Sequence, residues 1–121
     1  MLTAVAPLAL LLLVIGCAKG TTAKGTHYTA NIMGELEAYV PAKLEKVYAA
    51  AGKAVEDMGY SVDTSAIDVR EGKVEGRTAM DKAVRVKLYK QGEAVTKVQV
   101  CVGGDKLAAK DLLDKIEARS D

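Results

Sequence analysis

The sequence predicts an α+β fold in which an antiparallel sheet of about five strands carries two helices on one face. Three observations predict it. Two segments, in the middle and at the end of the chain, repeat apolar residues at intervals of three and four, as amphipathic helices do. Several short segments alternate apolar and polar residues, which is typical of half-buried strands. Only a few residues connect these segments, so we expect antiparallel hairpins and the order β-α-β-β-β-β-α.

The middle of the chain supplies the first strand and the first helix. Apolar and acidic residues alternate over Ile32–Tyr39, which predicts a half-buried strand. Pro41 marks the expected start of the helix and Gly59 its end. Between them, apolar residues recur at helical spacing: Leu44, Val47, Tyr48, Ala51, Val55 and Met58.

Four strands joined by hairpins are predicted after this helix. The first loses its alternation near Ser65–Ile67, where we expect a bulge. The predicted strands begin at Tyr60, Lys73 and Lys82, and the last runs through Val98, Val100 and Val102.

The chain ends in a second predicted helix. Gly103 and Gly104 break the last strand, and Asp105 is suited to cap the helix that follows. The apolar stripe of this helix consists of Ala109, Leu112, Leu113 and Ile116. Each helix has one apolar stripe and the sheet has one apolar face, so both helices are expected on that face.

The first residues of the chain have the features of an export signal. An apolar run over Leu8–Leu13 leads to Gly16 and Cys17, and no charged residue precedes Lys19. The motif resembles the lipobox of bacterial lipoproteins, which implies cleavage between Gly16 and Cys17 and a lipid on the Cys17 sulfur. Several acyl chains on one residue would anchor the protein stably in a membrane. The alternative is that this apolar segment remains uncleaved and spans the membrane as a helix.

This interpretation divides the chain into three segments. Residues 1–16 form a lipoprotein signal peptide that precedes the fold, and residues 17–27 form the lipidated cysteine and a flexible tether. Residues 28–121 form a single α+β domain.

Composition limits the class of protein, the kind of core and the disulfides that the chain can form. The net charge of +1 disfavours a nucleic-acid-binding protein, for which a strongly basic domain is expected. The chain has no Trp and no Phe, so its core must be mainly aliphatic. If Cys17 carries lipid, Cys101 is the only other cysteine, and no intramolecular disulfide can form.

The residues that could carry catalysis are few, and we expect no enzyme. The only histidine, His27, falls at the end of the predicted tether, away from any serine or cysteine nucleophile. Glu35 and Glu37 share one side of a predicted strand and could form a carboxylate pair, but strand alternation alone explains them. The sequence has neither a Cys/His cluster nor a calcium loop, so no metal and no cofactor is expected.

The most suggestive feature is the predicted sheet face opposite the helices. Alternation places a set of basic side chains there: Lys73, Arg77, Arg85, Lys87 and Lys97. The functional hypothesis is a surface that binds an anionic envelope component or an acidic protein. The alternative is a solvated face with cross-strand ion pairs. Cys101 belongs to the same predicted face, either as a free thiol or covered by a neighbouring segment.

Nearly the whole predicted mature chain is similar to a family of small bacterial lipoproteins known only as a domain of unknown function. Beside the lipobox, the resemblance rests on these segments: Gly34–Ala38, Leu44–Ala51, Met58–Tyr60 and Val100–Asp105. Members carry a basic residue where Cys101 stands. The resemblance implies an envelope location and a small α+β domain, and it supplies no catalytic residue.

Together these observations predict a lipid-anchored protein of the bacterial cell envelope that binds or supports another envelope component. Ala18 stands where an aspartate would commonly signal inner-membrane retention, so an outer-membrane anchor facing the periplasm is expected. Two alternatives remain: a small envelope hydrolase or accessory subunit that uses Glu35 and Glu37, and a structural lipoprotein that associates with itself through an exposed strand.

Overall fold

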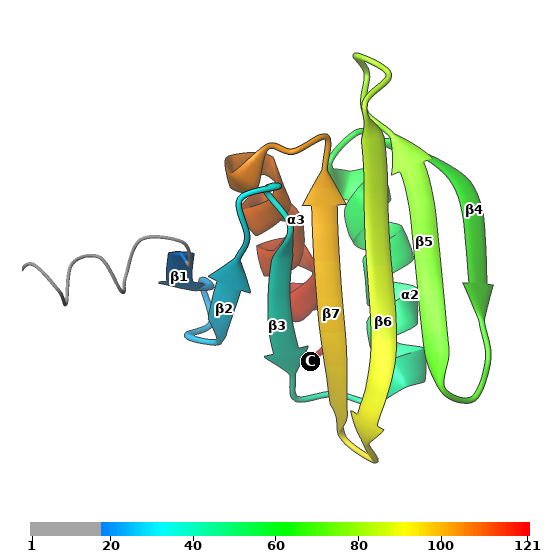
Figure 1. Ribbon diagram of the computed structural model, residues 1–121. Coiled ribbons are helices and arrows are strands. Elements are labelled where there is room, and N and C mark those ends of the chain that lie inside the picture. The colour runs from blue at the N-terminus through cyan, green and yellow to red at the C-terminus, as the bar shows by residue number, and fades with distance from the viewer. Residues whose placement is uncertain (1–17) are drawn as a thin grey trace, which may run out of the picture.

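A computed structural model describes residues 18–121, which form one antiparallel sheet of seven strands and two helices (Figure 1). The order of strands across the sheet is β1-β2-β3-β7-β6-β5-β4. The strands are β1 (Ala18–Thr21), β2 (His27–Ala30), β3 (Leu36–Val40), β4 (Ser61–Ile67), β5 (Glu71–Arg77), β6 (Ala83–Gly92) and β7 (Val95–Val102). The helices are α2 (Leu44–Asp57) and α3 (Lys106–Arg119).

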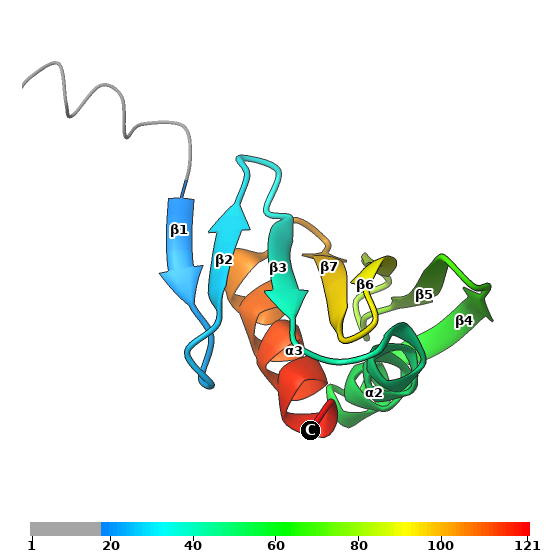
Figure 2. The same ribbon diagram turned by 90° about the horizontal axis from the view of Figure 1, so that it is seen from below.

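Both helices lie on the same face of the sheet, as predicted, and the other face is open (Figure 2). Helix α2 packs against β4, β5 and β6, whereas α3 packs against β7 and β3. The core between the two layers is almost entirely aliphatic. Its largest fully buried side chains include Leu36, Leu44, Leu88, Leu112, Leu113 and Ile116.

The expected number of about five strands is wrong, because the segment predicted as a tether folds as β1, a turn and the start of β2. Ala18–Thr21 pairs along its whole length with His27–Ala30, and β2 in turn pairs with β3. The turn between β1 and β2 is attached to α3: the Ala23 amide donates to Asp114 Oδ1 over 2.9 Å, and the Thr26 hydroxyl donates to Glu117 Oε2. Main-chain pairing and these side-chain contacts fix a segment whose composition alone predicts flexibility.

Several predicted boundaries shift by a few residues. Strand β3 begins at Leu36 rather than Ile32, because residues 31–35 form a hydrogen-bonded loop around the Asn31 side chain. Helix α2 begins at Leu44 rather than Pro41, and its N-cap, Lys43, makes no side-chain capping hydrogen bond. The irregularity in β4 falls between Val62 and Thr64 instead of Ser65–Ile67.

The start of α3 agrees with the start that was predicted from the sequence. Asp105 caps the helix by accepting hydrogen bonds from the amides of Leu107 and Ala108, over 3.0 and 3.1 Å. Gly103 and Gly104 both have positive φ angles, of 56° and 81°, which lets the chain turn from β7 into the helix.

Candidate functional site

The open face of the sheet carries the basic residues that alternation assigns to it. Along β5, β6 and β7, buried valines and leucines point to the helices, so the residues between them point to solvent. All members of the predicted basic set lie on this open face: Lys73, Arg77, Arg85, Lys87 and Lys97. Cys101 lies there as well, half-buried and opposite Arg85.

Three of these basic side chains meet in a hollow of about 330 Å³ over β5 and β6. We call it the basic hollow. Its lining consists of Glu71, Gly72, Lys73, Glu75, Arg85, Lys87 and Tyr89. Adjacent antiparallel strands bring these residues together, since Lys73 pairs directly with Lys87 and Glu75 with Arg85.

Glu75 partly neutralises the basic hollow. Its two carboxylate oxygens lie 3.3 Å from Lys73 Nζ and 3.5 Å from Arg85 Nε. Lys87 makes no ion pair with any residue in 18–121, and its direct strand neighbours are Lys73 and Gln99. Two lysines opposite each other repel, and an anion between them would relieve that repulsion. Lys87 is therefore the strongest candidate for contact with an anionic ligand.

The remaining two basic residues are engaged elsewhere on the open face. Arg77 lies 2.8 Å from Asp81 and 3.3 Å from Asp63, and its hydrogen bond with Asp81 raises the pKa of the guanidinium. Lys97 Nζ lies 4.9 Å from the centre of the Tyr89 ring, within the range of a cation–π interaction. The structure thus divides the predicted set into a group of three around the basic hollow and two residues with other partners.

A second hollow, of about 400 Å³, lies over the first three strands. We call it the histidine hollow, and Lys19, His27, Tyr28, Thr29, Glu37 and Tyr39 line it. This hollow was not predicted, because the composition around His27 is that of a flexible tether. The alternation of polar His27 and Thr29 with more buried Tyr28 and Ala30 was the signal for a strand.

The predicted carboxylate pair does not act as a unit in this hollow. Glu37 lines it and accepts a hydrogen bond from Gln99 Nε2 over 2.9 Å, whereas Glu35 precedes β3 and is absent from the lining. Glu37 instead lies diagonally across from His27, because Thr29 pairs with Glu37 and His27 is two residues from Thr29.

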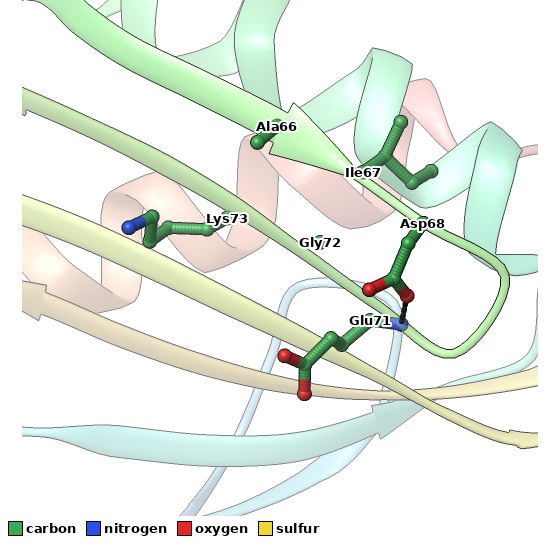
Figure 3. A pocket seen from close by; sticks show the side chains of 6 residues that line it. All are labelled: Ala66, Ile67, Asp68, Glu71, Gly72 and Lys73. Carbon is green, nitrogen blue, oxygen red and sulfur yellow. Dashed lines mark hydrogen bonds between the residues drawn. The ribbon is translucent and has the colours of Figure 1, made fainter.

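A third hollow, of about 440 Å³, lies at the turn between β4 and β5 (Figure 3). Two acidic side chains line it, and one of them, Asp68, already accepts hydrogen bonds from the amides of Arg70 and Glu71, over 2.8 and 2.9 Å. These hydrogen bonds lower the pKa of the Asp68 carboxyl. The side chain of Lys73 points away from Asp68 (Figure 3). The Asp68 carboxylate therefore serves the turn itself.

Within residues 18–121, no group of three or more His, Cys, Asp or Glu side chains is arranged to hold a metal ion. Neither helix in this part of the chain is long and apolar enough to span a bilayer. Cys17, the predicted lipidation site, and the predicted signal peptide lie outside the described residues.

The fold and these hollows define a class: a small α+β protein with a seven-stranded antiparallel sheet, two helices on one face and a charged open face. The chain belongs to the family described as "Protein of unknown function (DUF3568)", whose model matches residues 1–119. A comparison with curated proteins finds no match.

Proposed function

We propose that this chain is a lipid-anchored protein of the bacterial cell envelope that binds an anionic group of another envelope component through the basic hollow. The convergence of Lys73, Arg85 and Lys87 on one hollow carries the proposal. A volume of about 330 Å³ lies at the lower end of the range for small-ligand sites, and it suits a phosphate or carboxylate on a sugar. The proposal invokes no metal or cofactor, and a net charge of +1 does not favour nucleic acid as the partner.

The location in the proposal rests on the first residues of the chain. An apolar run that ends in Gly16 and Cys17 resembles a lipobox, so cleavage would leave a lipidated Cys17 as the first residue. Ala18 in the next position favours sorting to the outer membrane, with the domain facing the periplasm. There the basic hollow would meet carboxylates of peptidoglycan.

Charge reversal at one lysine tests the proposal. We expect Lys87→Glu to weaken binding of the detergent-solubilised lipidated protein to soluble peptidoglycan fragments roughly tenfold or more, since a charge-assisted contact contributes about 1.5–3 kcal/mol. Titration calorimetry or fluorescence anisotropy measures the change.

The matched control is Arg77→Glu. It alters the net charge by the same amount on the same face, but Arg77 is paired with Asp63 and Asp81 outside the basic hollow. Little loss of affinity is expected from this variant. An equal loss in both variants would mean that only overall charge matters, and no loss in either would exclude the basic hollow as the site.

Hydrolysis at the histidine hollow is the second candidate function, because His27 and Glu37 both line this open hollow. A general base and a carboxylate are a minimal set for hydrolysis. Cleavage of an envelope substrate that is lost in His27→Ala would favour this function over binding.

A further inference from the structure

The loop between β2 and β3 exposes two large apolar side chains beside the start of the described chain. Ile32 is 85% exposed, the highest value for a large apolar residue in the described part of the chain, and its neighbour Met33 is 73% exposed. Ala18, the first residue of β1, pairs with Ala30, only two residues before Ile32. The start of β1 and this loop accordingly lie on the same side of the molecule (Figure 2).

The loop holds a defined shape. The Asn31 side chain accepts hydrogen bonds from the amides of Met33 and Glu35, over 2.9 and 3.1 Å, and the Gly34 amide donates to the Asn31 carbonyl over 3.1 Å. Gly34 packs so closely on the backbone before α3 that a Cβ there would lie 2.3 Å from the Gly104 carbonyl oxygen. The apolar tip is thus presented by a braced turn, and exposure of two such side chains to water is unfavourable.

We infer that this loop is a membrane-contact element, with Ile32 and Met33 inserting into the bilayer that holds the lipid on Cys17. The inference rests on the proposed lipidation. Consecutive Cα atoms lie about 3.8 Å apart, so a lipid on Cys17 keeps Ala18 and its neighbours within a short distance of the head groups. No tether separates anchor and sheet, because β1 begins at Ala18. The partner of this apolar tip is accordingly the boundary of the hydrocarbon layer of the membrane.

The contact is apolar rather than electrostatic. Basic and acidic residues both flank this end of the molecule, so their charges offset each other. The basic residues are Lys19 and Lys106, and the acidic residues are Glu35 and Asp105. A zwitterionic bilayer suffices for contact of this kind, since apolar burial drives it.

Site-directed fluorescence on the full lipidated protein tests the inference. Met33→Cys receives an environment-sensitive probe, in a Cys101→Ser background that removes the other thiol, and the protein is inserted in phosphatidylcholine vesicles. The probe is expected to shift to the blue and to be quenched by spin labels carried on the lipid. Adding Ile32→Asp is expected to reverse both effects, because a charge opposes insertion.

The control is Val69→Cys in the same background, since Val69 is 80% exposed and lies in the turn after the edge strand β4, at the far edge of the sheet. Its probe is expected to show no lipid-borne quenching. Equal signals at positions 33 and 69, or a blue shift at position 33 without quenching by lipid, would overturn the inference. Intact mass of the same sample separates the two proposals, because a protein without lipid would overturn the anchor and the contact together.

Discussion

At the scale of single residues, the open face shows how far side-chain chemistry can be predicted. Strict alternation in β5–β7 was enough to place the five basic residues on one face, because a one-residue shift would bury a charge among valines. Their partners could not be predicted. That Glu75 bridges Lys73 and Arg85 while Lys87 stays without an ion pair in the described chain depends on side-chain contacts between strands.

Two glycines provide a test of the loop between β2 and β3. Gly34 and Gly25 both have positive φ angles, of 83° and 91°, but only a Cβ on Gly34 would meet another backbone segment. We expect Gly25→Ala to lower the free energy of unfolding by about 1–2 kcal/mol, the penalty for an L-residue in this conformation. Gly34→Ala should cost about 1–3 kcal/mol more, because the backbone near Gly104 must move.

Urea unfolding of both variants measures this difference. Equal losses of stability would show that Gly34 needs only its backbone conformation and that the close approach to Gly104 is not maintained.

At the scale of elements, the longer strands and both helices were predictable because their apolar periods extend over many residues. The two short strands β1 and β2 were not. Strand β1 has no apolar alternation, and the short alternation of His27–Ala30 follows a segment rich in glycine and threonine, which is typical of a linker. The turn between them is held by α3, about ninety residues later, as in the hydrogen bond from the Ala23 amide to Asp114. A contact so distant in sequence leaves no local pattern to read.

The two helices are joined at one end by an ion pair that gives stability a pH dependence. Arg119 Nε donates to Asp57 Oδ2 over 2.6 Å, and this hydrogen bond lowers the pKa of the Asp57 carboxyl. A carboxyl with a lowered pKa in the folded state stabilises the fold above its unfolded pKa, near pH 4. That contribution is lost as the pH falls through the folded-state pKa.

We therefore expect Asp57→Asn to be less stable than the parent protein at pH 6, with the difference shrinking toward pH 3. Thermal unfolding at the two pH values measures it. Asp111→Asn is the control, because Asp111 is exposed on α3 and has no ion pair in the described chain. A difference that stays constant with pH would mean that the Asp57–Arg119 pair does not form in solution.

At the scale of the whole molecule, one face of a seven-stranded sheet is covered by helices and the other is left to solvent. The two edge strands of the sheet, β1 and β4, differ in their surroundings. Strand β4 is exposed at every residue, and its bulge between Val62 and Thr64 interrupts the regular edge that self-association through β4 would use. The opposite edge strand, β1, follows Cys17 directly. This arrangement is compatible with the proposed anchor at one edge and the proposed binding through the open face.

The sequence determined the composition of both layers, but it could not reveal the hollows. The basic hollow forms where two lysines pair across β5 and β6, and the histidine hollow forms only because β1 and β2 extend the sheet. Both depend on strand pairing rather than on any local motif. The opposite holds for the proposed anchor, since the motif that suggests it is readable in the sequence and its residues lie outside the described structure.

The anchor at Cys17 is the central claim, and the intact mass of the protein extracted from membranes tests it most directly. The parent protein is expected to begin at Cys17 and to carry a thioether-linked diacylglycerol, whereas Cys17→Ala is expected to keep residues 1–16 and to carry no lipid. Detection of the full-length parent chain, with residues 1–16 intact and no fatty acid attached, would contradict the account.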